Sequence, residues 1–391
     1  MKGIMAAIAS LLLICMAAIS HAEDEATPEL ARELKLRDLG QALFFDVNLS
    51  LDRTQSCATC HDPARAFTDW RDSGVGAAAS MGGDMHTLGD RNAPTISYAR
   101  QIPALQLNQA GDYVGGLFWD GRADTLAEQA AGPPLNPDEM AMPDSSLVQQ
   151  RLKENINYGY AFKELFGDNV LENSDAAFTA MQESIAAFER TEFFSPFDSR
   201  YDRYLLGEYK PTEQETLGMT LFFSNQFANC NKCHQLQTLP ESKLETFSNY
   251  RYYNIGVPVN SALREANGRG AEQVDHGLLG NPKISDLAED GKFRVPTLRN
   301  IAITAPYMHN GVFKDLSTVM KFYNKYQAKG SKAQINPETG ERWGAPEVAD
   351  NIALEELESA RALDQRGTDA MVAFLRMLTD KRYEPLLEFE E

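Results

Sequence analysis

Two short stretches, Cys57-Ala58-Thr59-Cys60-His61 and Cys230-Asn231-Lys232-Cys233-His234, decide what this chain folds around. Both have the spacing Cys-x-x-Cys-His, which is typical of covalent attachment of haem c. Two thiols one helical turn apart can form thioethers with both vinyl groups of one porphyrin, and the adjoining His reaches the iron from the same side. We therefore predict two haems c, attached through these four Cys and ligated by His61 and His234.

Two other uses of paired cysteines explain the pattern less well. A disulfide framework would not need a His after each pair of Cys. A zinc site would bring the two pairs closer together in the sequence.

Composition and charge exclude several classes of protein. The 391 residues include 37 Lys and Arg against 56 Asp and Glu, which gives a net charge of −19. Such a chain repels a nucleic-acid backbone, so DNA and RNA binding are excluded. The chain is 43% hydrophobic and 24% charged, which is typical of a globular protein and not of a disordered or fibrous one. Its length allows two domains with a core in each.

The first 22 residues are typical of a signal peptide for export. Lys2 is followed by an apolar run from Ile4 to Ile19 and then by Ser20-His21-Ala22, with small residues where signal peptidase needs them. The apolar run is shorter than a membrane-spanning helix. We expect cleavage after Ala22 and a mature periplasmic protein without a membrane span.

The two haem motifs lie in similar halves of the sequence. Residues 39–45 and 217–223, which precede the motifs, both read Leu-Gly-x-x-Leu-Phe-Phe. Downstream, Pro94-Thr95-Ile96 is echoed by Pro296-Thr297-Leu298. A repeat of this length is typical of tandem domains.

Helical periodicity dominates both halves, and the connections are rich in Pro and Gly. We therefore predict an all-α fold made of two cytochrome c-like haem domains related by internal duplication. The expected boundaries are a signal peptide over residues 1–22, an N-terminal domain over 23–191 and a C-terminal domain over 192–391.

The halves differ on the side of the haem opposite to the proximal His. Seven residues past Leu126 stands Pro133, whereas seven residues past Leu316 stands Tyr323. A phenolate can bind ferric iron, but proline has no side-chain donor. The residues thus predict a first haem with one open face, where peroxide or dioxygen can bind, and a second haem closed by His234 and Tyr323.

Two alternatives to Tyr323 as a ligand stay open at this point. An aromatic residue at helical spacing is commonly a core residue. Met320 lies on the same face of the expected helix, and Met is an ordinary axial ligand of haem c.

Longer stretches resemble the bacterial di-haem cytochrome c peroxidase superfamily, and within it the subfamily that matures a quinone cofactor in another protein. These stretches are 55–69, 118–122, 194–199, 253–256, 304–311, 335–340 and 382–387. The resemblance covers essentially the whole mature chain, and several of the stretches lie outside anything that haem attachment requires.

The resemblance implies an enzyme that uses hydrogen peroxide, or dioxygen plus electrons, to reach a state with both irons oxidised. Members of the subfamily then oxidise the precursor of methylamine dehydrogenase at long range and complete tryptophan tryptophylquinone (TTQ) from two of its Trp residues. The alternative is a peroxidase that reduces hydrogen peroxide with electrons from a small periplasmic cytochrome. That enzyme would have Met320 as a ligand and a capped first haem, whereas a plain electron carrier would need both irons closed.

The resemblance also implies roles for single residues. Tyr323 matches the second ligand of the C-terminal haem, and Trp119 matches a hole relay between the haems. Glu139 matches a carboxylate that moves protons in the open pocket, although an acid after a Pro is also typical of a first helical turn. Gln129 matches a residue that orders this Glu.

A calcium ion between the domains is implied by the same resemblance, with Asn92, Thr304 and Pro306 matching the residues that bind it. A small cytochrome or a cupredoxin is the implied electron donor.

Three His and one departure complete the comparison with the family. His86 stands in a loop where many di-haem peroxidases cap the first haem, but we expect an exposed loop residue here. His276 and His309 are expected to be structural. The family presents a surface Trp six residues before the second haem His, whereas this chain has Ala228 there, with Phe227 beside it, and neither oxidises readily. The exit of the hole is therefore not predicted.

Overall fold

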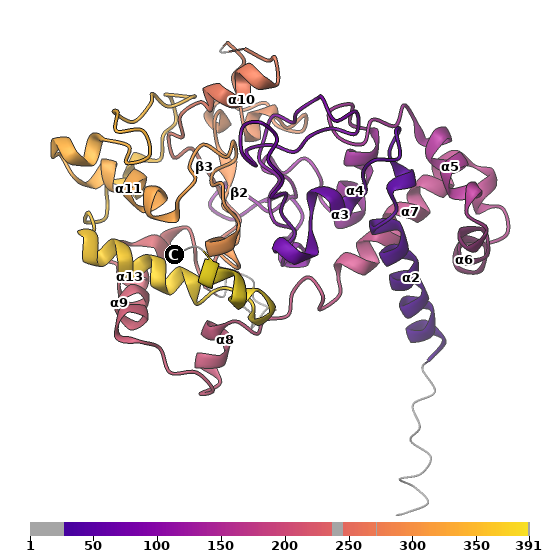
Figure 1. The fold of residues 1–391 in the computed structure, drawn as a ribbon, viewed down its shortest axis with the longest axis horizontal. Helices are drawn as coiled ribbons and strands as arrows, with labels where there is room; N and C mark the ends of the chain where they lie inside the picture. Colours follow the sequence, from indigo (N-terminus) through magenta and orange to yellow (C-terminus); the bar gives the residue numbers. More distant parts are fainter. Residues whose placement is uncertain (1–26, 237–244, 271, 390–391) are drawn as a thin grey trace, which may run out of the picture.

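A computed structural model describes residues 27–389 except 237–244 and 271. The expected signal peptide lies outside the described residues. Figure 1 shows the first half of the chain, in indigo and magenta, on one side of the molecule and the second half, in orange and yellow, on the other. Within the described part of the chain, no helix combines the length and the apolar character that crossing a bilayer requires.

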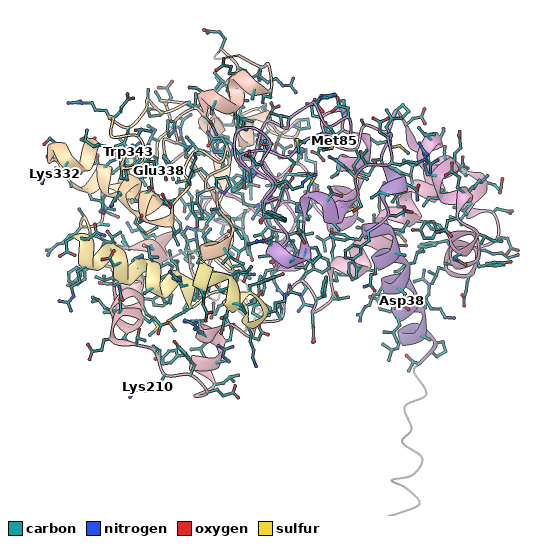
Figure 2. The ribbon with its side chains drawn as sticks, in the orientation of Figure 1. Asp38, Met85, Lys210, Lys332, Glu338 and Trp343 are labelled. Atoms are coloured by element: carbon teal, nitrogen blue, oxygen red, sulfur yellow. The ribbon has the colours of Figure 1, made fainter. Side chains whose placement is uncertain are left out.

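The first half is built mainly from helices that pack around α7. Its α-helices are α2 (Pro28–Phe44), α3 (Cys57–Cys60), α4 (Leu126–Leu135), α5 (Ser145–Glu154), α6 (Ile156–Phe166) and α7 (Ser174–Glu189). Helix α2 shows the pattern that drives this packing, because it exposes Asp38 to solvent and buries Leu39 (Figure 2).

The second half has its own set of helices. They are α8 (Arg200–Leu205), α9 (Glu213–Phe223), α10 (Ser261–Ala266), α11 (Leu316–Gln327), α12 (Leu354–Leu357) and α13 (Gln365–Arg376). Short 3₁₀ helices join the elements of both halves. They are η1 (Val47–Leu49), η2 (Pro63–Arg65), η3 (Ala99–Gln101), η4 (Val170–Glu172), η5 (Cys230–Lys232), η6 (Leu278–Gly280), η7 (Leu287–Glu289), η8 (Ile301–Ile303), η9 (Ser331–Gln334) and η10 (Lys381–Phe389).

Two small antiparallel sheets lie near the junction of the halves. One pairs β1 (Gln106–Leu107) with β2 (Tyr113–Val114), and the other pairs β3 (Tyr252–Tyr253) with β4 (Phe293–Arg294). The fold is therefore mostly helical, as predicted, with a minor strand content that the all-α prediction left out. A bridge between Val114 and Arg251 links the two sheets across the halves (Figure 1).

Each half has a separate hydrophobic core. Residues of the first core run from Leu36 to Phe194, whereas the second core is built almost entirely from residues between Tyr201 and Leu387. Aromatic rings pack against one another in both cores, with Phe44 against Phe188 in the first and Phe222 against Phe374 in the second. Each core packs against one of the two Cys-x-x-Cys-His motifs, so the two motifs lie in separate halves.

In each half, two helices cross in close contact at a glycine. An added Cβ on Gly40 of α2 would lie 1.8 Å from the carbonyl oxygen of Ser184 in α7, and one on Gly218 of α9 would lie 1.9 Å from that of Ala370 in α13. Only Gly permits the backbones to come this close. The Leu-Gly repeat seen in the sequence is therefore a packing device that both halves use.

We expect Gly40→Ala to lower the free energy of unfolding by about 1 to 3 kcal/mol, because the methyl group forces α2 away from α7. Urea unfolding followed by circular dichroism measures the change. Gly159→Ala is the control, since nothing lies within 4 Å of its Cβ in helix α6, and it should raise stability by about 0.5 to 1 kcal/mol. Equal effects of the two substitutions would contradict this account of the crossing.

Candidate haem sites

The first motif is shaped by a capped helical turn. In α3, the side chains of Ser56 and Thr59 form a reciprocal capping box, which starts the turn at Cys57. The amide of His61 donates to the Cys57 carbonyl at 2.9 Å, so both thiols and the imidazole lie on one turn. The His61 Nδ1 donates to the carbonyl oxygen of Phe67 at 3.0 Å. This bond leaves Nε2 as the free metal-binding nitrogen.

The second motif repeats this arrangement on the 3₁₀ turn η5. The amide of His234 donates to the Cys230 carbonyl at 3.0 Å, and its Nδ1 donates to the carbonyl oxygen of Phe247 at 2.9 Å. Both accepting residues have a left-handed backbone, with φ of 57° at Phe67 and 56° at Phe247. A bulky residue adopts this conformation at a cost that the fold must offset, which is typical of functional sites.

The chemical state of these side chains suits covalent haem. None of the four Cys forms a disulfide. Burial raises the pKa of Cys60 and of Cys230 to about 12 and that of Cys233 to about 11, and it lowers the pKa of His234 to about 4. The neutral imidazole can bind a metal ion, and the four thiols are free of disulfide bonds and could form thioethers with a porphyrin.

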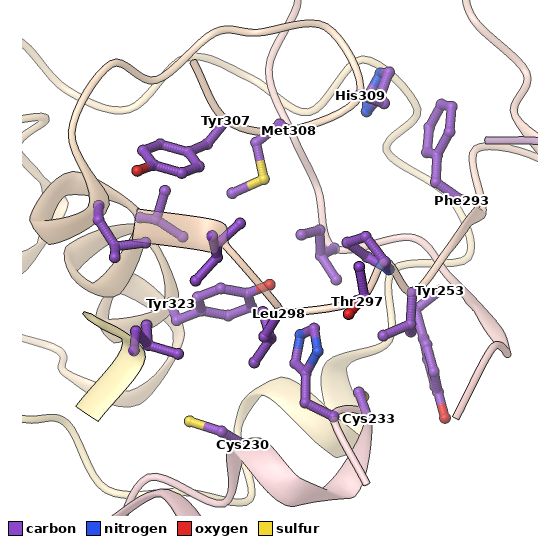
Figure 3. A pocket seen from close by; sticks show the side chains of 18 of the residues that line it. Cys230, Cys233, Tyr253, Phe293, Thr297, Leu298, Tyr307, Met308, His309 and Tyr323 are labelled. Carbon is purple, nitrogen blue, oxygen red and sulfur yellow. The ribbon is translucent and has the colours of Figure 1, made fainter. Parts of the chain in front are cut away.

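A cavity of about 270 Å³ opens beside the second motif (Figure 3). Cys230, Cys233 and His234 line one part of it, and Tyr323 of α11 extends its hydroxyl into it from another direction. Met320 lines the same cavity. Burial raises the pKa of Tyr323 well above its ordinary value, so the phenol gains most from a cation beside it, and a ferric ion is such a cation.

In the described residues of the first half, Pro133 takes the place that this phenol has in the second. Helix α4 begins at Leu126 and α11 begins at Leu316, so Pro133 and Tyr323 occupy the same position within their helices. The carbonyl oxygen of Pro133 accepts from the Met140 amide at 3.2 Å, and the ring offers no donor atom.

Glu139 is half-buried close to the first motif. Its charge raises the pKa of both Cys57 and Cys60, which places the carboxylate within electrostatic reach of the thiols. Burial raises the pKa of Glu139 itself. Asn136 Nδ2 donates to Glu139 Oε1 at 2.7 Å, a partner that the sequence interpretation missed. In the described structure no hydrogen bond joins Gln129 to Glu139, and Gln129 lies half-buried on α4.

Trp119 is held by residues on both sides of the junction. Its indole Nε1 donates to the carbonyl oxygen of Asn92 at 2.9 Å, and its own carbonyl oxygen accepts from the amide of Arg294 at 3.0 Å. Trp119 also lines the cavity of the second motif. The indole therefore lies where the first half meets the second haem site.

The contacts across the junction are reciprocal. The amide of Asn92 donates to the carbonyl of His309 at 2.7 Å, which mirrors the bond from Arg294 to Trp119. In the sequence repeat, Asn92 corresponds to Arg294 and Trp119 to His309. Such self-complementary contacts are typical of an interface related by a two-fold axis.

Comparison with known proteins agrees with this geometry. The family model described as di-haem cytochrome c peroxidase matches residues 35–210. The methylamine utilization protein MauG of Paracoccus denitrificans is 52% identical over 381 residues, which cover 97% of this chain and 98% of that protein. The chain belongs to the di-haem cytochrome c peroxidase family. It is accordingly an oxidoreductase with two haem groups.

Solved structures of the family share the fold. The di-haem peroxidase BthA of Burkholderia thailandensis gives a TM-score of 0.77 at 32% identity, over 89% of this chain and 87% of that one. A MauG-like protein associated with microbial copper homeostasis gives a TM-score of 0.64 at 30% identity, over 90% and 93% of the two chains. Both likenesses span the two halves of the molecule.

The structure also places the three other histidines and Ala228, where the chain differs from the family. His86 is exposed in its loop. His276 donates from Nδ1 to Asp290 at 2.7 Å on the surface, and buried His309 stacks on the Phe293 ring at 3.6 Å between centroids. Ala228 lines the second cavity, so this position lies against the haem site although its side chain has no redox chemistry.

Glu189 is a buried carboxylate that the sequence interpretation missed. It lies in the last turn of α7, and burial raises its pKa to about 8. Its charge raises the pKa of Cys57, so it is close to the first motif. The Gly40 and Gly218 crossings align Glu189 with Leu375, which lines the second cavity. This correspondence depends on the helix crossings, so the sequence alone did not reveal Glu189.

We expect Glu189→Gln to stabilise the haem-loaded protein at alkaline pH. A carboxyl with a raised pKa in the folded state binds more protons there than in the unfolded state, so the wild type loses stability as the pH rises from about 4.5 to about 8. The variant should gain on the order of 1 to 4 kcal/mol at pH 9 and almost nothing at pH 4. Urea unfolding at both pH values measures the difference, with the exposed Glu192→Gln as control. A gain independent of pH would contradict the burial of a titrating carboxylate.

Proposed function

We propose that this chain is a di-haem c enzyme that uses hydrogen peroxide, or dioxygen plus electrons, to complete TTQ in the precursor of methylamine dehydrogenase. The observation that carries the proposal is the 52% identity to MauG, which extends over nearly the whole length of both proteins. The phenol of Tyr323 in the second cavity supports it, because this ligand type separates such an enzyme from a methionine-ligated peroxidase.

The two haems have unequal tasks in this proposal. When bound, they supply the oxidising equivalents and store them. His61 would hold the first haem, and Pro133 offers no second ligand, so oxidant could bind there. His234 and Tyr323 would hold the second haem, which would then serve electron exchange.

Glu139 is the proton-transfer group at the open face. Its buried position keeps the carboxyl protonated to a higher pH than usual, so it can give a proton to an incoming oxidant and take one back. Asn136 fixes Oε1, which leaves the second carboxyl oxygen available for this transfer. Gln129 on α4 is assigned the supporting role in the same pocket.

Trp119 is the relay between the haems. Its indole N–H is bonded to Asn92, and its backbone is tied to Arg294, so the ring stays fixed at the junction of the halves. A fixed aromatic system between two redox centres lets a hole pass with little reorganisation.

The proposal includes an internal duplication. It divides the chain into an N-terminal domain over residues 23–191 and a C-terminal domain over 192–391. The two separate cores, the matched Gly crossings and the reciprocal junction support a common origin of the halves.

A calcium ion bound by Asn92, Thr304 and Pro306 would brace the junction. All three residues line the wall of the second cavity, and Asn92 Nδ2 donates to the Ala77 carbonyl, which leaves Oδ1 as the oxygen donor. Hard oxygen donors of this type suit calcium.

The proposed location is the periplasm, where the export signal directs the chain and where the dehydrogenase precursor would meet it. A small cytochrome or a cupredoxin is the proposed electron donor when dioxygen is the oxidant.

The alternative function is reduction of hydrogen peroxide with electrons from a small periplasmic cytochrome. Met320 favours it, because this side chain lines the same cavity as Tyr323 and could close the second iron instead. The cytochrome c peroxidase Ccp of Escherichia coli, 31% identical over 74% of this chain and 53% of that protein, is a relative of that kind.

Substitution of the phenol separates the two functions. We expect Tyr323→Phe to keep both haems attached, to change the spectrum of the second haem and to abolish quinone formation, since the oxygen ligand is lost. Met320→Leu, the matched control on the same helix, should change neither the spectrum nor the turnover. Unchanged spectra in Tyr323→Phe, together with a changed spectrum in Met320→Leu, would assign the ligand to sulfur.

The function itself is tested by mixing the purified protein, hydrogen peroxide and the dehydrogenase precursor and following quinone absorbance. We expect quinone to appear only when all three are present. Rapid peroxide consumption with a reduced cytochrome, and no quinone, would establish the peroxidase alternative.

A further inference from the structure

The sulfur atom of Cys233 has an oxidisable neighbour. Asn249 connects Tyr253 to Cys233, because its Nδ2 donates to the Tyr253 hydroxyl oxygen at 3.2 Å. The amide of Asn249 in turn donates to the Cys233 carbonyl at 2.9 Å. The phenol is thus held beside the residue whose sulfur would join the protein to the haem.

Tyr253 also connects the cavity to the outside of the molecule. Its ring lines the cavity, and the hydroxyl turns away from the centre of the cavity toward its edge (Figure 3). The side chain is half-buried, so part of it reaches solvent. A side chain that lies beside the haem-attaching residue and also reaches solvent is placed to carry an electron between the haem and a docked protein.

The first haem site differs at the corresponding sulfur. Arg71 Nη2 lies 3.6 Å from Cys60 Sγ and is paired with Asp69 at 2.6 Å. A guanidinium cannot be oxidised under these conditions and resists an approaching positive charge. The second site therefore combines a haem sulfur with a redox-active neighbour, and the first site does not.

Two other oxidisable residues with exposed surface are placed less favourably. Trp70 is 55% exposed but donates to Asp62, beside the first haem site. Trp343 is separated from Tyr323 by the ring of Phe322, and its Nε1 donates to the Ala333 carbonyl. Neither ring lines the second cavity.

We propose that Tyr253 is the residue through which the second haem withdraws electrons from the protein substrate. This inference rests on the proposed function, since it names the exit of the long-range oxidation. Its basis is the link to Cys233 through Asn249, the position at the edge of the cavity that Cys233 also lines, and the partial exposure of the ring.

The step balances with groups that surround the phenol. Tyr253 gives one electron to the oxidised second haem and its Oη proton to the Glu356 carboxylate or to solvent. The charge of Glu356 acts on both Tyr253 and Cys233, and the carboxylate lines the cavity, so it is a nearby acceptor. The tyrosyl radical then takes one electron and one proton from a Trp residue of the substrate, which restores the phenol.

The test compares haem-loaded wild type with Tyr253→Phe, and with Tyr160→Phe as a control for an exposed tyrosine in the first half, 70% exposed. Peroxide is added without substrate, and mass spectrometry maps oxygen added to tyrosine. We expect oxidation at Tyr253 well above that at Tyr160. With the dehydrogenase precursor present, Tyr253→Phe should lower the quinone rate at least tenfold while haem spectra stay unchanged.

The outcomes separate this inference from the proposed function. Absence of oxidation at Tyr253 in the wild type, or a wild-type quinone rate in Tyr253→Phe, overturns the relay and leaves TTQ formation standing. Oxidation at Tyr253 without quinone in the wild type supports the exit and overturns the proposed substrate. Loss of quinone in Trp343→Phe or Trp70→Phe, with full activity in Tyr253→Phe, assigns the exit to that Trp.

Discussion

The hydrogen bond from each proximal imidazole to a backbone carbonyl is the interaction on which both sites depend. It fixes the ring of His61 against Phe67 and the ring of His234 against Phe247, and so aims Nε2 at the place of the iron. The accepting carbonyls have this direction only because the two Phe residues adopt a left-handed backbone. The strain is offset by the aromatic cores in which both rings are fully buried.

The two Cys-x-x-Cys-His motifs are built alike. The difference between the two sites therefore lies on the side opposite the motif His. Pro133 and Tyr323 hold the same position in helices that begin at matching Leu residues. In the function we propose, this one difference within a shared frame would leave the first centre open and close the second. The sulfur neighbours differ in the same way, with a guanidinium in the first site and a phenol in the second. If the halves arose by duplication, as we propose, the two scaffolds would be alike and a few differing side chains would give electron flow its direction.

The junction between the halves ties these centres into one unit. Trp119 and His309 occupy reciprocal positions, and each accepts a backbone hydrogen bond from the other half. Arg91 lies beside them and forms a bidentate pair with Asp275 and a single bond to Asp120. These contacts hold the indole in place, which the relay role that we propose for Trp119 would need.

The sequence by itself determined the haem chemistry, because covalent attachment needs residue types at a local spacing that one helical turn spans. The two Cys-x-x-Cys-His motifs, the helical class and the contrast of Pro133 with Tyr323 are all local features of this kind. Three features came only from the tertiary structure. They are the pairing of Asn136 with Glu139, the burial of Glu189 and the position of Tyr253 beside Cys233. Burial and direction of a side chain depend on elements distant in sequence, and no local pattern records which of several tyrosines folds against a haem sulfur.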